Sequence, residues 1–456
     1  MPRRILLVIG VSTAWGYLVI KHGGVERPDR YIAEAAIGLI ALVWQLTPSR
    51  QPSEPLRGVL QWTIALLTCY PLLQLTPLPA AWLALASPAR AELAGFIEQL
   101  TPAHAGLSSR AAPLSVSPPA TFAYFLMIGS YVLLFLMTRD LAIQWGRMAW
   151  VMAVPIVLVA SVEAGVGLVQ SFSGASAVSA TGTYGNRNHF SGLLEMALPF
   201  AVIYPLALLQ QHRRSLSAGA AISALPWMAA AALLLEGILY SFSRMGFASC
   251  LFSLLVMAAL YFSQGASRRT LLAGSVVAAL ALVAVLALLP PAQLISRFGD
   301  VNSETLAPEG RVELYKESFR LFAHFPVFGC GLGGFESAFM RYKASGFLFA
   351  DDFVHNDYIQ FLTEMGVAGF AIAAALMGTL VFNAVRTFAL GDRSEAYFLQ
   401  LACLGSFAAI GLHSAADFNL YIPANAMLLA WICGISSGES TMLGRANGGM
   451  TMPSDV

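Results

Sequence analysis

The sequence predicts an all-α, polytopic membrane protein with about twelve transmembrane helices and a helical loop on one side of the bilayer. Of the 456 residues, 57% are hydrophobic and only 11% are charged, whereas about 25% of residues are charged in soluble domains. The apolar residues are also gathered in long runs. A run of about 17–25 apolar residues is long enough to cross a bilayer as a helix.

Twelve such runs occur along the chain, at residues 4–20, 31–47, 58–77, 120–138, 148–170, 188–210, 223–241, 246–263, 270–290, 357–382, 396–415 and 422–437. The first run resembles a signal peptide, but no small-residue cleavage site precedes Lys21. We therefore expect it to remain as the first span.

The distribution of Lys and Arg predicts the orientation, because short cytoplasmic loops are enriched in these residues. With the N-terminus inside, thirteen of them fall in cytoplasmic segments and five in short outer loops, namely Lys21, Arg27, Arg30, Arg187 and Arg244. This asymmetry predicts that the two long loops, 78–119 and 291–355, lie outside and that both chain ends lie in the cytoplasm.

This topology divides the chain into four segments: N-terminal helices with loop 78–119 in residues 1–147, central helices in 148–290, an outer loop in 291–355, and C-terminal helices with a cytoplasmic tail in 356–456. Loop 78–119 contains a short helical pattern that we expect to lie on the membrane surface, formed by Leu93, Phe96, Ile97 and Leu100.

The second loop, 291–355, is predicted to contain two helices. The first ends before Pro326 and has one face marked by Val312, Tyr315, Phe319 and Phe322, and the second lies around residues 336–342. Between them, the glycine-rich run 329–334 follows no strand and is not followed by Gly-Lys-Ser/Thr. It therefore predicts a tight turn rather than a nucleotide-binding loop.

Several classes of site are disfavoured by the composition. The five cysteines have no CxxC spacing, which indicates neither a metal site nor a disulfide framework. The basic residues are scattered rather than arranged in a stripe with aromatic residues, so we expect no nucleic-acid partner. We also expect no cofactor.

Loop 291–355 returns to the membrane at His355, Asn356 and Asp357. A lone histidine is commonly a structural group, but Asp357 could orient the ring or raise its basicity, as a general base requires. We therefore consider His355 a candidate catalytic base, and Asn356 and Asp357 candidate substrate-binding residues.

Three arginines on the predicted outer side are candidates for binding an anion. Arg311 begins the loop helix, where the helix dipole disfavours a cation, and this favours a binding role. Arg244 lies at a turn between two spans, where an arginine either serves function or snorkels to the headgroups. Arg187 lies at the start of the sixth span within a dense polar cap that includes Asn186, Asn188 and His189.

Further carboxylates lie within or at the ends of spans. Glu163, Glu195 and Glu236 fall inside apolar runs, where an unpaired charge is costly. They are expected either to partner the outer arginines or to mark the proton pathway of a transporter. Asp417 and Asn419 follow the eleventh span at its outer end.

A set of arginines with one histidine on the outer face suits a diphosphate leaving group. Guanidinium groups bind phosphate bidentately and remain charged, and an imidazole can deprotonate an incoming hydroxyl. The chemistry indicated is group transfer by positioning and charge stabilisation.

A series of short motifs runs through residues 170–435: Gly182-Thr183-Tyr184-Gly185-Asn186-Arg187-Asn188-His189-Phe190, Ser243-Arg244-Met245-Gly246, Gly310-Arg311, Pro326-Val327-Phe328-Gly329-Cys330-Gly331-Leu332-Gly333, His355-Asn356, Glu364-Met365-Gly366-Val367-Ala368-Gly369 and Asp417-Phe418-Asn419-Leu420. In order and spacing, this series resembles the O-antigen ligase family, which includes surface-polysaccharide polymerases and pilin-glycosylating ligases. The first 150 residues match that family in topology only.

The resemblance implies that a glycan is moved from undecaprenyl diphosphate to an acceptor hydroxyl, without nucleotide sugar or metal, on the periplasmic side of the bacterial inner membrane. It also implies that Arg244 and Arg311 hold the diphosphate while His355 activates the acceptor. The expected partners are the lipid-linked donor, the acceptor and membrane lipids.

Loop 78–119 has no counterpart in the resemblance, so the acceptor stays open between a lipid A-core sugar, which we favour, a growing polymer and a protein Ser/Thr. A polymerase or a protein O-oligosaccharyltransferase would use the same donor. A twelve-helix transporter is a more remote alternative, because transporters place polar or broken segments at the bilayer midplane, whereas the polar groups here gather at helix ends. A scaffold protein would leave the charged residues without a role.

Overall fold

The computed structural model is almost entirely helical, as the sequence predicts. It describes residues 2–47, 55–100, 111–173, 179–211, 218–263, 308–343, 352–391 and 394–448. The α-helices are α1 (Pro2–Ile20), α2 (Arg27–Leu46), α3 (Gly58–Leu75), α4 (Ala80–Ala86), α5 (Pro88–Leu100), α6 (Pro118–Trp145), α7 (Val154–Ser173), α8 (Arg187–Gln211), α9 (Ala218–Tyr240), α10 (Arg244–Ser263), α13 (Pro308–His324), α14 (Phe335–Phe339), α15 (Asp357–Leu390), α16 (Glu395–His413) and α17 (Pro423–Gly448). Short 3-10 helices include η4 (Gly182–Tyr184) and η5 (Asn419–Tyr421).

Nine helices in the described part of the chain are long and apolar enough to cross a membrane, and each corresponds to a predicted span. The predicted spans 31–47 and 422–437 are also helices, α2 and α17, but neither is among the nine. The predicted span 270–290 lies outside the described residues. The fold is therefore that of an all-α, multi-pass membrane protein.

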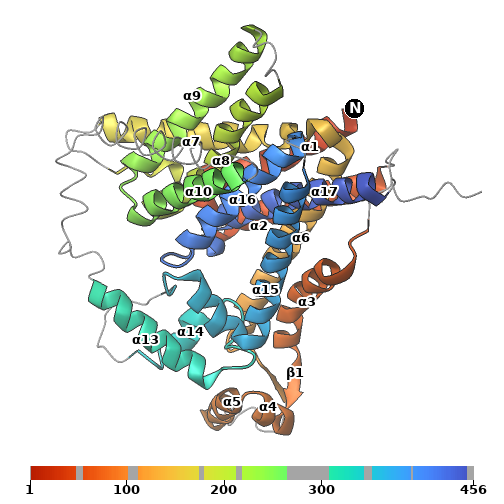
Figure 1. The fold of residues 1–456 in the computed structure, drawn as a ribbon. Coiled ribbons are helices and arrows are strands. Elements are labelled where there is room, and N and C mark those ends of the chain that lie inside the picture. The colour runs from red at the N-terminus through yellow and green to blue at the C-terminus, as the bar shows by residue number, and fades with distance from the viewer. Residues whose placement is uncertain are drawn as a thin grey trace, which may run out of the picture.

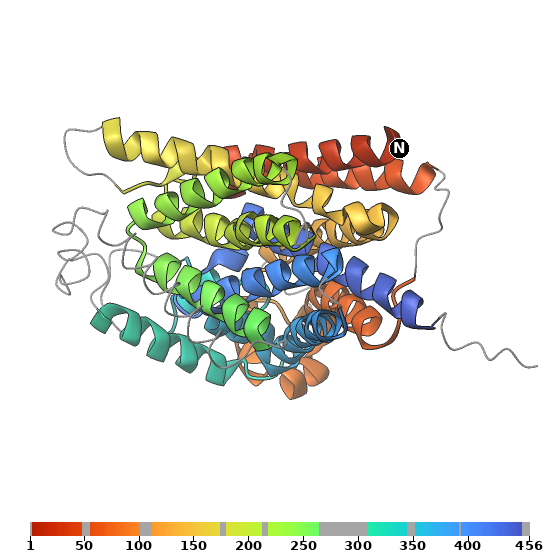
Figure 2. The ribbon, with the colours of Figure 1, turned by 45° about the horizontal axis from the view of Figure 1, so that its top comes forward.

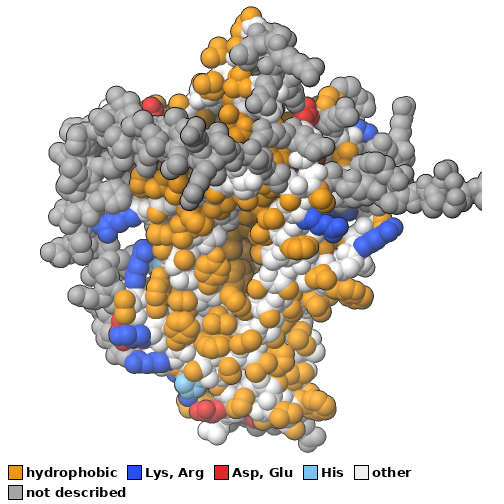
Figure 3. Space-filling model, viewed as in Figure 1, with side chains coloured by type: hydrophobic (Ala, Val, Ile, Leu, Met, Phe, Trp, Pro, Cys, Tyr) orange, Lys and Arg blue, Asp and Glu red, His pale blue; other side chains and the backbone are white. Residues whose placement is uncertain are grey.

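The long helices lie side by side and run in roughly similar directions, as Figure 2 shows. Helices α13, α14, α4 and α5 lie together at the opposite side of the molecule from α9 (Figure 1). The face seen in Figure 3 is broadly hydrophobic at its centre, and the Lys and Arg side chains lie at its margins. This distribution is that of a surface in contact with lipid, since charged side chains are excluded from the hydrocarbon core.

Helix α17, although last in the chain, lies in the core of the bundle. Its residues Leu428, Trp431, Ile432 and Ile435 are fully buried. The ring of Trp431 packs edge-on against Trp15 of α1, with centroids 5.9 Å apart. The polar residues of α17 are surrounded by neighbouring helices rather than by lipid. Helix α17 can therefore carry polar residues within a membrane bundle.

Small residues let α17 approach α6 closely. A Cβ added at Gly434 would overlap the Thr138 hydroxyl and lie 2.8 Å from the carbonyl oxygen of Phe135, and one added at Gly438 would lie 2.7 Å from the Cβ of Ala142. Close backbone approach at small residues is the usual basis of helix association in membranes, where no hydrophobic effect drives helices together.

The predicted helices of loop 291–355 are confirmed as α13 and α14, but the face of α13 marked by Val312, Tyr315, Phe319 and Phe322 is not its most buried face. Val312 and Phe319 are about half exposed, at 49% and 48%, whereas Leu314 and Leu321 are buried. The buried pair packs in one cluster with residues of α14 and the start of α15. The face with Leu314 and Leu321 is the buried one because this cluster, rather than the membrane bundle, supplies the apolar partners of α13.

The glycine-rich run 329–334 forms tight turns, as predicted, and these turns lock onto α15. Helix α15 is broken at Gly366, which has φ +64° and ψ −174°. The N–H groups of Val367 and Ala368 donate to the carbonyls of Pro326 and Val327. In return, the N–H groups of Cys330 and Gly331 donate to the carbonyls of Thr363 and Glu364, both at 3.0 Å. These four hydrogen bonds give backbone groups near the break partners in the loop.

Loop 78–119 is hydrogen-bonded to the same glycine-rich run. Its strands β1 (Pro77–Pro79) and β2 (Ala111–Pro113) pair antiparallel, and the N–H of Val116 donates to the carbonyl of Cys330 at 2.8 Å. The predicted surface helix is α5, on which Phe96 and Ile97 are about half exposed. An exposed apolar strip on a short helix is consistent with contact to the membrane surface.

We predict that Gly434→Ala destabilises the protein by about 1–3 kcal/mol, because the added methyl group overpacks the contact between α6 and α17. The measurement is the thermal unfolding midpoint of the purified protein in detergent. The matched control is Gly378→Ala on α15, where an added Cβ meets nothing within 4 Å and the gain in helix propensity should leave stability equal or slightly higher. Equal midpoints for the two variants would contradict the proposed tight contact.

Candidate active site

His355 lies in the turn that leads into α15 and has a strained backbone. Its φ is +55°, a left-handed conformation that is uncommon for residues other than glycine. The turn is held by Tyr315 of α13, whose hydroxyl donates to the His355 carbonyl at 3.1 Å, and by Gln360, whose Oε1 accepts from the N–H of Val354 at 2.7 Å. The imidazole remains 29% exposed, so a substrate can reach it.

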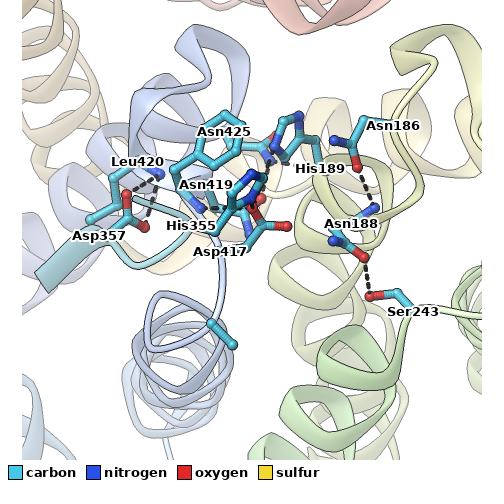
Figure 4. A network of polar contacts seen from close by, with 12 residues as sticks. Asn186, Asn188, His189, Ser243, His355, Asp357, Asp417, Asn419, Leu420 and Asn425 are labelled. Atoms are coloured by element: carbon cyan, nitrogen blue, oxygen red, sulfur yellow. Dashed lines mark hydrogen bonds and ion pairs between the residues drawn. The ribbon is translucent and has the colours of Figure 1, made fainter. Parts of the chain in front are cut away.

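The carboxylate of Asp417 lies beside the His355 ring, as Figure 4 shows. Its Oδ1 is 3.4 Å from Nδ1 of His355 and 3.8 Å from Nε2 of His189, and it accepts the N–H of Phe418 at 2.9 Å. The Asp417 side chain is only 1% exposed. Although burial raises the pKa of Asp417, the nearby rings of His189 and His355 hold it well below its ordinary value.

The partner predicted for His355 was Asp357, and this prediction is wrong. Asp357 is fully buried. Its carboxylate accepts the Ser414 hydroxyl at 2.7 Å and the N–H of Leu420 at 3.2 and 3.3 Å. As the first residue of α15, Asp357 turns away from the preceding imidazole toward the segment 414–420. There it ties α15 to the segment that carries Asp417.

Asn356 caps α15 rather than pointing into open space. Its Oδ1 accepts the N–H of Ile359 at 3.1 Å, which satisfies one of the donors at the helix start. Its Nδ2 donates to the carbonyl of Ala415 at 2.7 Å. Both polar atoms of the side chain therefore fix the geometry of the turn, and a role in binding substrate stays a prediction.

Arg311 reaches the same turn from α13. Its Nη1 donates to the carbonyl of Ala416, the residue before Asp417, at 3.1 Å. The side chain is half-buried, and its Nε has no hydrogen-bond partner in the described part of the chain. A guanidinium with only part of its donor set engaged, next to a candidate base, can accept further contacts from an anion.

Arg187 and Arg244 begin α8 and α10, and these two helix starts are joined. The Ser243 hydroxyl donates to Oδ1 of Asn188 at 2.9 Å, and Oδ1 of Asn186 accepts the N–H of Asn188 at 2.8 Å, as Figure 4 shows. Arg187 is half-buried and Arg244 is exposed. The two asparagines hold the polar cap in shape, and their binding role stays a prediction.

His189 links this cap to the His355 turn. It is buried, at 5% exposure, and its ring packs edge-on against Phe418 with centroids 4.7 Å apart. The His355 ring meets the same phenylalanine at 4.8 Å. His189 was predicted to bind substrate, but here it contacts Asp417 from within the protein. Its position instead favours support of that carboxylate.

Glu364 is a further buried carboxylate, which begins one of the sequence motifs but was not among the predicted site residues. It accepts the N–H groups of Gly333 and Phe335 at 2.8 and 3.2 Å, the Gln360 amide at 3.0 Å and the Tyr421 hydroxyl at 2.7 Å. Four donors around one carboxylate make it a structural anchor. The available signal was the glycine-rich run itself, whose N–H groups need an acceptor.

The carboxylates inside the spans do not pair with the outer arginines as predicted. Glu163 accepts the N–H and the hydroxyl of Thr183, both at 2.9 Å. Glu195 pairs with His413, with Oε1 3.0 Å from Nδ1 and both side chains fully buried. Glu236 lies on an exposed face of α9. Nearby helix ends satisfy the first two, because they lie closer than the arginines at the surface.

Within the described ranges, no group of three or more His, Cys, Asp or Glu side chains is placed to hold a metal ion. Metal independence nevertheless stays a prediction. The arrangement of the described residues combines a supported imidazole with a nearby guanidinium, which is enough for proton transfer and stabilisation of negative charge.

Comparison with known families agrees with this geometry. Residues 229–374 match the family model described as O-antigen ligase. This stretch runs from α9 to the first half of α15 and contains Arg244, Arg311 and His355. No curated protein matches the chain. The match covers about a third of the chain: it shows an O-antigen ligase domain within a helical protein of the multi-pass membrane type, and it supports a glycosyltransferase of the ligase or polymerase type.

Proposed function

We propose that this protein transfers an oligo- or polysaccharide from undecaprenyl diphosphate to an acceptor hydroxyl, and that the acceptor is a lipid A-core sugar. The reaction takes place on the periplasmic face of the bacterial inner membrane. The observation that carries the proposal is the partly exposed His355 imidazole, backed by the buried Asp417 carboxylate and placed beside Arg311 at one end of a membrane bundle.

The contact with Asp417 determines which nitrogen of His355 acts as the base. When Nδ1 carries the proton and donates to Asp417, the lone pair is on Nε2. Nε2 removes the proton from the acceptor hydroxyl as the oxygen attacks the anomeric carbon of the donor sugar. The Asp417 carboxylate stabilises the imidazolium that forms.

The leaving group is the lipid diphosphate. As the bond from the anomeric carbon to the phosphate oxygen breaks, the electron pair stays with the diphosphate, and negative charge grows there. Arg311 and Arg244 stabilise this charge, because a guanidinium offers paired donors to phosphate oxygens. The proton on His355 then passes to water, which returns the base to its starting state.

A polymerase and a protein O-oligosaccharyltransferase would use the same residues on the same donor and differ only in the acceptor. The direct test is an assay of purified protein in liposomes with the lipid-diphosphate glycan and three acceptors: a lipid A-core glycolipid, a second donor glycan and a protein with exposed Ser/Thr. Transfer to the glycolipid alone supports the ligase assignment. Transfer only to another acceptor reassigns the enzyme, and no transfer to any of them contradicts the proposal.

Loss of the diphosphate contact should lower the rate strongly. We predict that Arg311→Ala reduces transfer by about 30- to 1000-fold, the range for losing a positioned donor to a developing anion. Arg311→Lys should rescue this loss only in part, because an ammonium lacks the paired geometry. The control is Lys316→Ala on the exposed face of the same helix. Near-normal transfer by correctly inserted Arg311→Ala would rule out the diphosphate contact, and Arg244→Ala is tested in the same way.

The pH profile should separate the base from its carboxylate. Because the pKa of Asp417 lies well below its ordinary value, this group stays ionised until strongly acidic pH. A fall in activity at mildly acidic pH is then assigned to the proposed base rather than to Asp417. His355→Gln should abolish this limb along with most of the rate.

Asp417→Asn removes the charge that favours the protonated imidazole. Its acid limb should therefore move to lower pH, with a lower plateau because the imidazolium formed in the reaction is less stabilised. Profiles of kcat/KM for the wild type and both variants give the comparison. A limb that stays unchanged in Asp417→Asn would show that the carboxylate does not act on His355.

Transfer should proceed without a divalent metal, because the arginines supply the positive charge that a metal would bring to the diphosphate. The measurement is the transfer rate in excess EDTA, with Mg²⁺ and Mn²⁺ added back. An undiminished rate is the expected result. Activity that is lost in EDTA and restored by either ion would overturn the arginine mechanism.

A further inference from the structure

Arg30 is an almost buried arginine whose charge is incompletely matched. It lies one turn into α2 and is 9% exposed. Its Nε is 3.6 Å from Oε1 of Glu34, and neither of these two atoms has a hydrogen-bond partner in the described structure. The guanidinium carbon lies over the rings of Tyr31 and Tyr124, 5.2 and 5.9 Å from the centroids. The aromatic rings hold the cation in place, while one distant carboxylate leaves most of its donor capacity available.

The start of α2 lies at the same end of the bundle as His355. A Cβ added at Gly23, just before α2, would meet Tyr184 of η4 and Ile422, which directly follows η5. Arg27, one turn before Arg30 on the same helix face, is exposed. The two arginines therefore form a basic site at this end, separate from the arginines at the starts of α8, α10 and α13.

A row of aromatic rings joins Arg30 to His355. From Tyr124, the row passes to Tyr421 at 5.7 Å, to Phe353 at 5.6 Å, to Phe418 at 4.3 Å and to the His355 ring at 4.8 Å, measured between centroids. Tyr124 and Phe353 are partly exposed, over buried Tyr421 and Phe418. Aromatic faces flanked by a few polar groups are typical of ligand sites, and they suit the apolar faces of sugar rings.

The separation between Arg30 and His355 decides which part of a substrate can bind at Arg30. The diphosphate of the donor is the leaving group, so it must lie next to the anomeric carbon and hence near His355. Four aromatic rings stand between Arg30 and the imidazole. A phosphate at Arg30 must therefore belong to a part of a substrate that lies several groups away from the reacting hydroxyl.

We propose that Arg30 and Arg27 bind a lipid-borne phosphate, and that its source is the acceptor glycolipid, whose sugars lie along the aromatic row with the reacting hydroxyl at His355. This assignment rests on the proposed function, since it names the acceptor side of the same site. A phosphate of a bilayer phospholipid has the same chemistry and is the other source that the experiment must separate.

The experiment measures binding as well as transfer. Purified protein in nanodiscs of neutral phosphatidylcholine is titrated with a phosphorylated glycolipid acceptor and with the same acceptor after dephosphorylation, and Kd and acceptor KM are recorded. In the wild type, removal of the phosphate should weaken binding by about 10- to 100-fold, the range for losing hydrogen bonds to a charged group. Arg30→Gln should weaken binding of the phosphorylated form by a similar factor and leave the dephosphorylated form and the donor KM unchanged.

Glu34→Gln separates this role from a structural ion pair. If Arg30 binds phosphate, the loss of its competing carboxylate leaves binding equal or tighter. If the pair only holds α2, Glu34→Gln and Arg30→Gln should lower the thermal unfolding midpoint alike and weaken both acceptor forms alike, which overturns the proposal. Arg320→Gln on the exposed face of α13 controls for general loss of positive charge and should change nothing.

A second set of nanodiscs, containing phosphatidylglycerol, distinguishes the phosphate of the acceptor from the phosphate of a bilayer lipid. An effect of Arg30→Gln that depends on the acceptor phosphate supports the assignment. An effect that appears only with phosphatidylglycerol overturns the acceptor assignment and gives the site to a bilayer lipid. Because Kd is measured without turnover, phosphate-dependent binding with no transfer would contradict the proposed function and still support the Arg30 site.

Discussion

The break in α15 at Gly366 and the loop that fills it are the constraint on which the site depends. A Cβ at Gly366 would overlap the Val327 carbonyl, and one at Gly329 would overlap the backbone of Glu364. Two backbones in direct contact leave no freedom for side chains, so the loop and the helix can meet in only one way. The Glu364 carboxylate then accepts N–H groups of the loop and the hydroxyl of Tyr421 in η5. A single buried carboxyl group thereby fixes the relative positions of α15 and η5. His355 lies just before the first and Asp417 just before the second, so their separation follows from this anchor.

Near His355, the acidic side chains are buried and the arginine side chains are more accessible. The carboxyl groups of Asp357, Glu364 and Asp417 are at most 1% exposed, and each accepts hydrogen bonds from protein donors, as buried polar groups generally do. The guanidinium of Arg311 is only half-buried, and that of Arg244 is exposed. The buried carboxyl groups thus contact only the protein, whereas the more accessible arginines are the ones to which the proposal gives an anionic substrate. Asp357 and Asp417 nevertheless have different contacts: the first joins two segments, and the second lies against the ring of the proposed base.

The sequence predicts the helices well because a long apolar run has few alternatives in a membrane. The sequence also identifies the candidate site residues, because glycines, arginines and a histidine between spans stand out against an apolar background. It fails where the answer depends on distance through space. Asp357 follows His355 by two residues, but the start of a helix turns it away, and Asp417, 62 residues along the chain, takes its place. Likewise, the apolar pattern of α13 does not reveal that this helix packs against α14 rather than against lipid. The contact with α14 decides which face of α13 is buried.

The proposed division of the site also has a consequence for specificity. The residues assigned to the donor and to the base, Arg244, Arg311 and His355, lie within the matched stretch 229–374. Arg30 and Tyr124, assigned to the acceptor, lie outside it on α2 and α6. Enzymes that share a lipid-diphosphate donor need the same leaving-group contacts, whereas their acceptors differ in charge and size. A chain can therefore keep its chemistry in one segment and change its acceptor in another. The aromatic row joins the two segments, so an acceptor is selected by whether it spans the distance from the α2 arginines to the imidazole.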